Sequence, residues 1–399
     1  MEKIKIKKLI KQVRGVAYKP DDVHSKLDEN AVMLLRANNI DGGEINFDDV
    51  VYVDKSKVSR AQYLKKGDIL ICGSSGSKNL VGKAATFQVN TECTFGAFCK
   101  VVRPNDGKSK LLDVFFQSPI YRERISQLSL GANINNIRNE HIDEMEIPVY
   151  SLDEQTMIVK KIQLIQDVIR KRKNEVAYLD ELIKARFVEM FGDSVHNSMK
   201  WTVKRLGELS IQINSGNTPK GGQQVYVDKG ITFFRSQNVW KNRLKMDDIA
   251  YIDAKTHASM RHSSLKHGDI LMTKTGRINT ENSSLGRAAL YMGEDDAANV
   301  NGHVYFIRLK TGINKKFILR ILISDEYRDY IRSVCVGGID KRQINKEHIE
   351  DFPIICPPTR LIDEYITFVE QVDKSKAVIE KSLKELETLQ ASLMQKYFS

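Results

Sequence analysis

Hydrophobic residues follow two different periods along this chain. In two long stretches, short apolar runs and alternations separated by Gly-Asp and other turn residues predict β-strands. Ile69–Cys72 and Ile270–Thr273 are the clearest candidates for buried strands. After each stretch the apolar positions alternate four and three residues apart, which is the heptad pattern of a long packed helix. The pattern therefore predicts two β-rich regions, each followed by a helix.

The two heptad stripes run from about Asp153 to Met190 and from about Leu361 to Tyr397. Each apolar position of the second stripe lies 207 residues beyond a stripe position of the first. Arg172 and Lys376 interrupt the stripes, and polar residues at such positions commonly fix the register of paired helices. The apolar members are Ile158, Ile162, Ile165, Ile169, Val176, Leu179 and Ile183, and then Tyr365, Val369, Val372, Ile379, Leu383 and Leu386.

The same internal repeat extends through the β-rich regions. Matched segments recur in one order, and their offset grows from 199 to 207 residues along the chain, as loop insertions in a duplicated domain would produce. Leu35-Arg36-x-x-Asn39 returns as Phe234-Arg235-x-x-Asn238, Leu64-x-x-Gly67-Asp68-Ile69-Leu70 as Leu265-x-x-Gly268-Asp269-Ile270-Leu271, and Ser118-x-x-Tyr121-Arg122 as Ser324-x-x-Tyr327-Arg328. The Gly-Asp pair of each copy is expected to form a structural turn that leads into the buried strand.

These patterns predict an α+β protein with two similar domains in tandem. We expect β-rich domains at 1–150 and 193–356, and long helices at 151–192 and 357–399. Since the second domain must join the end of the first helix to the start of the second, the helices should pack as an antiparallel coiled coil with approximate two-fold symmetry. At about 1.5 Å per residue, helices of about 38 residues would form a spacer of about 55 Å.

Composition narrows the choice of partner and compartment. The net charge of +11 and the pI of about 9.2 favour binding to a polyanion, either nucleic acid or an anionic membrane. No run of apolar residues is long enough for a membrane helix, and the N-terminus lacks the apolar segment of a secretory signal, so we expect a soluble cytoplasmic protein. The five cysteines include no C-x-x-C pair, which favours reduced thiols without a zinc site.

Two polar, glycine-bearing loops follow the predicted buried strands and are the main candidates for DNA contact. Their backbone amides and hydroxyl groups suit phosphates, and their Lys, Arg and Asn side chains suit base edges, although a plain solvated loop is the competing interpretation. The candidates here are Ser75, Lys78 and Asn79 in the first copy, and Lys274, Thr275, Arg277 and Asn279 in the second.

Other candidates occupy matched positions elsewhere in the two copies. Some have side chains that pair bidentately with guanine or adenine, but a turn with a structural Arg fits them equally well. These are Arg36, Asn39, Arg235, Gln237 and Asn238. Lys83 and Arg287 keep a positive charge at equivalent places, which favours phosphate contact. Two further matched segments differ in composition, as two readers of different half-sites would, and contribute Asn135, Arg138, Lys341, Arg342 and Gln343.

The sequence contains no catalytic constellation that we recognise. It lacks a phosphate-binding G-x-x-x-x-G-K-[ST] loop, an amino-methyltransferase Asn-Pro-Pro-aromatic run and a G-x-G-x-x-G fingerprint. We therefore expect a non-catalytic DNA-binding chain. Two alternatives stay open: a nuclease or methyltransferase with unfamiliar motifs, and a scaffold whose β-rich domains bind protein instead of DNA.

Several of these motifs resemble those of the specificity (S) subunits of type I restriction-modification systems. They are the Asn214–Pro219 run, the Phe234-Arg235-x-x-Asn238 segment, the L-x-x-G-D-I-L stretch in both copies and Asp153-Glu154-Gln155. The first copy departs from the pattern because it keeps only Gly15 and Pro20 of the Gly-x-Thr-Pro run. The resemblance adds Thr218 and Lys220 to the candidate DNA-binding residues.

The resemblance also implies function and partners. It implies two target-recognition domains that read two halves of a bipartite DNA site, spaced by a helix pair that docks two methyltransferase subunits. Restriction subunits with translocase and nuclease activity would join them. No cofactor is expected on this chain, whereas S-adenosylmethionine, ATP and Mg²⁺ are expected on the partner subunits.

Overall fold

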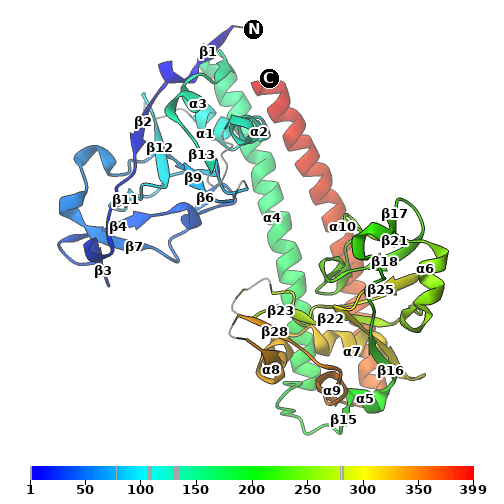
Figure 1. Cartoon of the computed structure of the whole chain (residues 1–399). Helices are drawn as coiled ribbons and strands as arrows, with labels where there is room; N and C mark the ends of the chain where they lie inside the picture. The colour runs from blue at the N-terminus through cyan, green and yellow to red at the C-terminus, as the bar shows by residue number, and fades with distance from the viewer. Residues whose placement is uncertain are drawn as a thin grey trace. The chain divides into compact units, whose positions relative to one another are not determined.

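Contacts divide the chain into two compact units. In the computed structural model, the described residues are 2–77, 79–105, 110–128, 135–278, 280, 283–338 and 340–399, with Asn135 described by its backbone alone. Unit 1 comprises Met1–Val176 together with Ala377–Ser399, and unit 2 comprises Ala177–Lys376. Each unit combines small β-sheets with helices, so the predicted α+β class with two tandem domains is confirmed (Figure 1).

Unit 1 contains two four-stranded sheets. The first has the order β10-β8-β12-β2 with antiparallel pairing, and its strand β8 coincides with the buried strand predicted from the sequence. The second has the order β11-β4-β7-β3, in which β11 and β4 run parallel. The strands are β2 (Ile10–Arg14), β3 (Val23–His24), β4 (Ala31–Leu35), β7 (Val51–Asp54), β8 (Ile69–Cys72), β10 (Ala84–Thr86), β11 (Cys93–Phe95) and β12 (Cys99–Pro104).

Shorter elements complete unit 1. Three two-stranded ladders join segments that are close or distant in the sequence: β1 (Lys3–Lys5) with β14 (Glu146–Pro148), β5 (Ile40–Asp41) with β6 (Glu44–Ile45), and β9 (Ser74–Ser75) with β13 (Asn135–Asn136). The helices are α1 (Lys110–Phe116), α2 (Pro119–Leu128) and α3 (Asn139–Asp143). Helix α1 buries most of its side chains in the core of the unit.

Unit 2 repeats the topology of the two four-stranded sheets strand for strand. Its sheets have the orders β16-β26-β22-β24 and β17-β21-β18-β25, and β18 pairs parallel with β25 as β4 does with β11. The strands are β16 (Ser210–Ser215), β17 (Tyr226–Val227), β18 (Ile231–Phe234), β21 (Ala250–Ile252), β22 (Ile270–Thr273), β24 (Ala288–Leu290), β25 (Ala298–Val300) and β26 (Val304–Leu309). The duplication inferred from sequence is therefore present in the fold.

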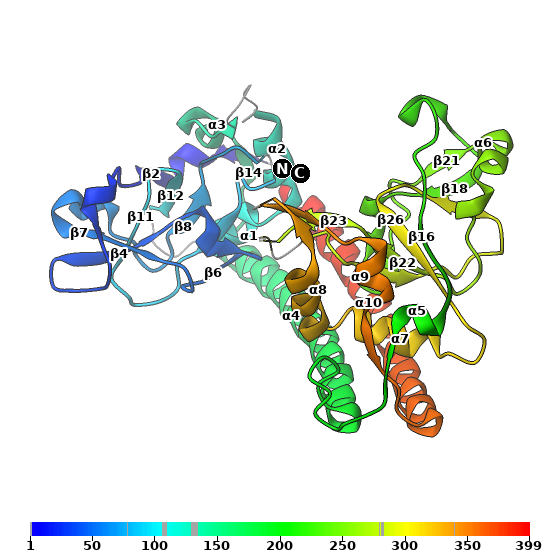
Figure 2. The same ribbon diagram turned by 60° about the horizontal axis from the view of Figure 1, so that its bottom comes forward.

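The shorter elements of unit 2 include one sheet larger than its counterpart in unit 1. It has three antiparallel strands in the order β23 (Thr275–Arg277), β28 (Lys341–Gln343) and β27 (Val336–Gly337). Figure 2 labels strand β23 of this sheet. The other elements are β15 (Val203–Arg205) with β29 (Pro353–Ile355), β19 (Val239–Trp240) with β20 (Arg243–Leu244), and helices α5 (Leu206–Leu209), α6 (Ala254–Ser259), α7 (Lys315–Leu322), α8 (Asp325–Val334) and α9 (Lys346–Glu350).

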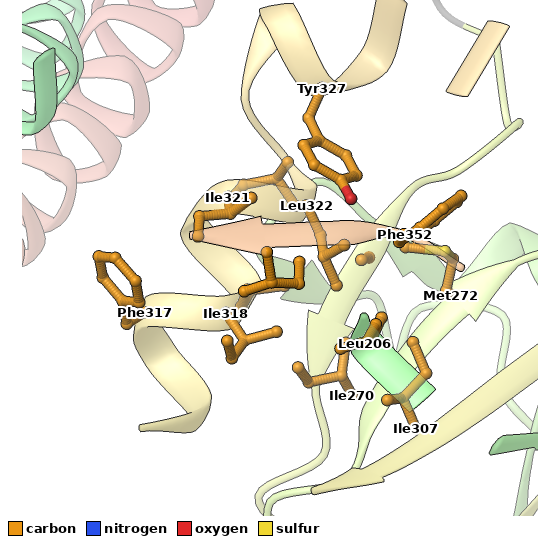
Figure 3. Packing of buried hydrophobic residues seen from close by; sticks show 14 of the residues in the cluster. Leu206, Ile270, Met272, Ile307, Phe317, Ile318, Ile321, Leu322, Tyr327 and Phe352 are labelled. Atoms are coloured by element: carbon orange, nitrogen blue, oxygen red, sulfur yellow. The ribbon is translucent and has the colours of Figure 1, made fainter. Parts of the chain in front are cut away.

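The core of unit 2 forms where α7 packs against the β22 and β26 sheet. Ile318 and Leu322 project from α7 toward the sheet residues Ile270 and Ile307 (Figure 3). Phe317 points the other way, where its ring packs against Phe187 and Phe191. Each fully buried side chain of this kind contributes about 1.5 to 3 kcal/mol by leaving water. This apolar layer fixes the sheet from which the polar loops of the unit emerge.

The Gly-Asp pair of each copy is structural, as expected. Gly67 and Gly268 have positive φ angles of 92° and 84°, which favour glycine. Asp68 is buried and receives two hydrogen bonds of 2.7 and 2.8 Å from Arg103, and Asp269 receives the same pair, at 2.7 and 3.0 Å, from Arg308. Each bidentate pair locks the turn to the neighbouring strand.

Two 40-residue helices confirm the heptad prediction: α4 (Leu152–Phe191) and α10 (Thr359–Phe398). Each contributes one part to each unit. In unit 1, Tyr150 donates a 2.9 Å hydrogen bond to the Tyr397 carbonyl, and Lys173 lies 3.1 Å from Glu387. Tyr150 directly precedes α4, and the α10 partner number falls from 397 to 387 between Tyr150 and Lys173, so these two segments are antiparallel. No helix within the described ranges is long and apolar enough to cross a membrane.

The segments of α4 and α10 in unit 2 are antiparallel as well. Arg186 pairs with Glu364 at 2.9 Å, and Lys376 makes a bidentate contact with Asp180 at 2.7 and 2.8 Å. Lys376 thus links the two helices at the position where it interrupts the apolar stripe. Arg172, by contrast, pairs with Glu175 of its own helix at 2.7 Å, so the register-fixing role predicted for polar stripe residues fits Lys376 and not Arg172.

Candidate nucleic-acid interface

A polar β-ribbon in unit 2 brings together two of the predicted contact segments. Strands β23 and β28 pair antiparallel, with Thr275 opposite Gln343 and Arg277 opposite Lys341 (Figure 1). Arg277 and Lys341 are exposed, and the side chain of Arg277 keeps 68% of its surface accessible while forming an ion pair with Asp340 at 3.3 Å. Segments more than sixty residues apart in the sequence therefore present one basic face. We call the paired strands β23 (Thr275–Arg277) and β28 (Lys341–Gln343) the unit 2 ribbon.

The ribbon is held in place by the backbone of Lys274. Its N–H donates to the carbonyl of His303 at 2.8 Å, and its carbonyl accepts from the N–H of Ile344 at 2.9 Å. The loop that contains Thr218 lies beside the same place, because a side-chain atom added at Gly302 would meet the Thr218 hydroxyl at 3.8 Å. Thr218 and Lys220 are both exposed. The structure thus gathers the predicted Asn214–Pro219 run near the start of the ribbon.

Close backbone contact explains the glycine that both copies keep in that run. A Cβ atom at Gly216 would lie 1.8 Å from the Val300 carbonyl oxygen, and one at Gly15 would lie 2.1 Å from the Gly96 carbonyl oxygen. No other residue fits without moving the backbone. Gly15 and Gly216 are therefore structural residues that set the path of the loop.

Unit 1 carries a matching ribbon at the equivalent place. Strand β9 pairs with β13, so that Ser75 faces Asn135, and the carbonyl of Gly73 accepts from the N–H of Ile137 at 2.8 Å as Lys274 does from Ile344. The described side chains of this unit 1 ribbon (β9 and β13) are neutral, and Arg138 is exposed just beyond it. Asn79 is exposed in the loop that follows β9, where its carbonyl accepts from Arg122.

Three predicted residues need separate mention. Lys78 and Asn279 lie outside the described residues, and so does the side chain of Asn135. Their DNA contacts stay predictions.

Arg342 and Gln343 of the unit 2 ribbon are half-buried, and Gln343 donates to Asn345 at 3.3 Å.

The Arg-x-x-Asn segments are structural turns. Asn39 is 0% exposed: its side chain accepts from the Arg36 N–H at 2.8 Å and donates to the carbonyls of Asn46 and Asp49. Asn238 is 1% exposed and makes the same three bonds with Arg235, Lys245 and Asp248. Side chains that are buried and fully bonded have no surface to offer a base. Asn39 and Asn238 are therefore corrected from DNA-binding candidates to turn residues.

The Arg side chains of these segments also bind within their own turns. Arg36 pairs with Asp49 at 2.9 Å, and Arg235 pairs with Asp248 at 3.1 Å while lying over the Tyr226 ring. Gln237 is exposed and donates to Asp248 at 3.0 Å, an interaction that, together with Arg235, holds the pKa of Asp248 below its usual value. The structural alternative thus describes Arg36 and Arg235 better than base recognition.

Lys83 and Arg287 do not belong to the ribbons, and each lies in other surroundings. Lys83 borders a hollow of about 1180 Å³ between the β5–β6 hairpin, α1 and α4, where it lies 3.6 Å from Asp41. Arg287 is half-buried, stacks on Trp240 at 3.8 Å and donates to the Ser283 carbonyl at 3.0 Å. Burial, with a smaller effect of Arg328, lowers the pKa of Arg287. The two cations occupy equivalent positions with different surroundings.

Sequence reasoning missed one pair of exposed residues beside the ribbons. The carbonyls of Phe98 and His303 accept the equivalent hydrogen bonds from Gly73 and Lys274, and both side chains are exposed. One indication of this pair was present in the sequence: Phe98 and His303 occupy matched positions of the repeat but differ in residue type. Within the described ranges, no three His, Cys, Asp or Glu side chains are grouped to hold a metal ion.

Comparison with known proteins assigns the family. The model of the type I restriction modification DNA specificity domain matches residues 25–178 and again 199–388, which places one match in each copy of the repeat. This chain belongs to that family.

Individual relatives agree with the assignment. The chain is 30% identical over 401 residues to the type I restriction enzyme StySPI specificity subunit of Salmonella potsdam, with 96% of this chain and 84% of the relative covered. It is 28% identical over 404 residues to the EcoKI specificity subunit of Escherichia coli strain K12, with 97% and 86% covered.

Solved structures share the fold across the whole chain. The S subunit of a type I restriction-modification system from M. genitalium has a TM-score of 0.52 at 15% identity, with 100% of this chain and 96% of that chain covered. A chain from a study of complex assembly and conformational transition of the type I system has a TM-score of 0.53 at 15% identity, with 100% and 97% covered.

Proposed function

We propose that this chain is the DNA sequence-recognition subunit of a type I restriction-modification complex and binds a bipartite target. The observation that carries this proposal is the pair of equivalent ribbons, one in each unit. A two-stranded β-ribbon fits the major groove of B-DNA, where each base pair shows a distinct pattern of donors and acceptors. Each unit would then read one half of the target.

The composition of the two ribbons supports different half-sites. Arg277, Lys341 and Gln343 offer cationic and amide donors in unit 2, whereas Ser74, Ser75 and Asn136 offer neutral polar groups in unit 1. Arg and Lys pair well with guanine, and Asn and Gln pair well with adenine. The same fold can therefore present two different recognition surfaces.

The helices α4 and α10 would form an antiparallel coiled coil that sets the distance between the two half-sites. The apolar stripes and the contact between Lys376 and Asp180 support this role. This helix pair would also dock two methyltransferase subunits, with restriction subunits joining them. The chain itself would be non-catalytic, and S-adenosylmethionine, ATP and Mg²⁺ would bind to the partner subunits.

The decisive experiment expresses the chain with its methyltransferase partner and maps methylated bases by sequencing the host DNA. We expect one bipartite sequence, with two fixed half-sites and a gap of constant length. Methylation without sequence preference, or at an undivided site, would overturn the proposal. A complex that assembles through protein contacts in high salt and binds no DNA would favour the scaffold alternative.

A further inference from the structure

Phe98 is an exposed aromatic residue that lies directly beside the unit 1 ribbon. Its carbonyl oxygen accepts hydrogen bonds from Gly73 at 2.8 Å and from Ser74 at 3.0 Å, which fixes its backbone to the start of β9. The residue nevertheless keeps 70% of its surface exposed. Exposing a phenyl ring to water is unfavourable, by roughly 25 cal/mol for each Å². An exposed ring on such a well-held backbone suggests a binding role.

Phe98 is also one of the residues that line a hollow of about 530 Å³. Tyr18, Arg36, Asn38 and Ser74 line the same hollow. The lining combines apolar side chains with a few polar groups. An apolar group of a ligand that reaches the ribbon would therefore find a partner surface here.

The equivalent position in unit 2 has a side chain of different chemistry. His303 accepts the matching 2.8 Å hydrogen bond from Lys274, and its side chain is also exposed. The backbone of this position is thus the same in both units, while the exposed group is an apolar ring in one and an imidazole in the other. A fixed backbone with a variable exposed side chain is what a specificity-determining position requires.

We infer that Phe98 determines specificity in unit 1 by packing against the 5-methyl group of a thymine. This inference rests on the proposed function, and it names a base type that the ribbon residues do not. Among the groups that base pairs present in the major groove, the thymine methyl is the apolar one. A phenyl ring beside a polar ribbon complements it, because the polar side chains can bond neighbouring bases while the ring covers the methyl group.

The test measures binding of the complete methyltransferase complex to its mapped target, with deoxyuridine replacing each thymine of the unit 1 half-site in turn. Deoxyuridine lacks only the methyl group and keeps every hydrogen bond of the base pair. At one position, we expect the wild-type complex to lose affinity about fourfold, the value for one buried methyl-sized group. The complex with Phe98→Ala should bind both duplexes equally.

Three further variants keep the inference falsifiable. Phe98→Leu retains an apolar side chain and should retain part of the response to the methyl group. Leu27→Ala removes another exposed apolar side chain, 56% exposed and in the loop before β4, and should leave the full response. His303→Ala should also leave it, because His303 belongs to unit 2.

The outcomes separate this inference from the proposed function. A unit 1 half-site without thymine, or one in which uracil has no effect at any position, would overturn the role of Phe98 and leave bipartite recognition intact. Loss of affinity in Phe98→Ala without any effect of uracil would show that Phe98 contributes through a contact other than the thymine methyl group and would also overturn the thymine assignment. Absence of a bipartite target would instead refute the proposed function itself.

Discussion

The two units place the same ribbon on the same topology, but the ribbon is basic in unit 2 and neutral in unit 1. In unit 2 the ribbon displays Arg277 and Lys341, whereas the described side chains of the unit 1 ribbon are neutral. The buried framework around both ribbons, down to the Asp68–Arg103 and Asp269–Arg308 pairs, is conserved between the units. Duplication has therefore kept the residues that hold the ribbon and changed the residues that it presents.

A second difference between the units lies beside the β5–β6 and β19–β20 hairpins. In unit 2, Trp240 stacks between Lys245, 3.6 Å from its ring, and Arg287. Unit 1 has Asp41 at the matching hairpin position, next to the hollow of about 1180 Å³. In unit 2, Trp240 and Arg287 instead line a hollow of about 120 Å³. A cation-aromatic stack thus stands in unit 2 where unit 1 has an acidic side chain.

The largest effect is expected from changing the helices that the units share. Deleting residues 168–174 from α4 and the matching seven residues from α10 removes one heptad from each and keeps both stripes in phase. The recognition elements should approach by about 10 Å, or about three base pairs of DNA, with a helical rotation of about 100°. We expect either a shorter gap between unchanged half-sites or loss of bipartite binding, measured by methylation-site sequencing.

The single-helix deletion is the control for that experiment. Removing the heptad from α4 alone mismatches the helix pair and should weaken assembly with the methyltransferase more than the double deletion does. Unchanged half-sites with the original gap after the double deletion would show that the helices do not set the spacing.

The buried ion pairs offer a symmetrical test of how independent the two units are. Asp269→Ala leaves the guanidinium of Arg308 without its buried carboxylate, which should cost about 3 kcal/mol of stability. Hydrogen exchange should show the loss of protection in unit 2, whereas Asp68→Ala should produce it in unit 1. Equal loss in both units from either substitution would show that they are not stabilised independently.

The basic ribbon should contribute to DNA affinity through unit 2 alone. For the double variant Arg277→Ala, Lys341→Ala, we expect weaker binding and a salt slope reduced by about 1.8, if each cation contacts one phosphate. The matched control, Lys229→Ala with Lys255→Ala, removes the same charge from exposed positions outside the ribbon. Equal slopes for the two double variants would assign the effect to net charge rather than to the ribbon.

The smallest effect concerns the first turn of α3 in unit 1. The Nδ1 atom of His141 accepts from the Arg138 N–H at 3.3 Å, and burial, followed by the nearby Arg138 charge, lowers the pKa of His141. Because the folded pKa lies below the unfolded value, this stabilisation is present at neutral pH and is lost as the pH falls below about 6.5.

The protection factor of the Arg138 amide, taken relative to its intrinsic exchange rate at each pH, should therefore fall in acid by an amount equivalent to about 0.5 kcal/mol of capping energy. His141→Asn can accept the same bond without titrating in this range and should keep the protection factor constant. If the protection factor of the variant falls as well, another group causes the loss.

The sequence predicted the framework better than the site. Heptad spacing located α4 and α10 to within a few residues, and apolar runs located β8 and β22, because these patterns report burial directly. The domain boundaries predicted near residues 150, 192 and 356 stay a prediction. The contacts define two compact units, and each unit contains part of both long helices.

The contact residues were harder to predict for physical reasons. Asn39 and Asn238 were ambiguous because Asn serves turns and adenine recognition with the same amide group. Pairing of β23 with β28 joins distant segments, and local patterns carry no information on such pairing. Phe98 was missed because an isolated exposed aromatic residue has no periodic signal.

The division of the helices also constrains how the chain acquires its structure during synthesis. Unit 2 is one continuous segment, whereas the core of unit 1 contains Ile158 and Ile162 together with Met394, Tyr397 and Phe398. More than two hundred residues separate these partners, and contacts that close such long loops form slowly. Since chains emerge from the ribosome N-terminus first, unit 2 can complete its core while part of the unit 1 apolar surface still awaits the end of α10. The nascent chain would therefore expose that surface to chaperones or to aggregation.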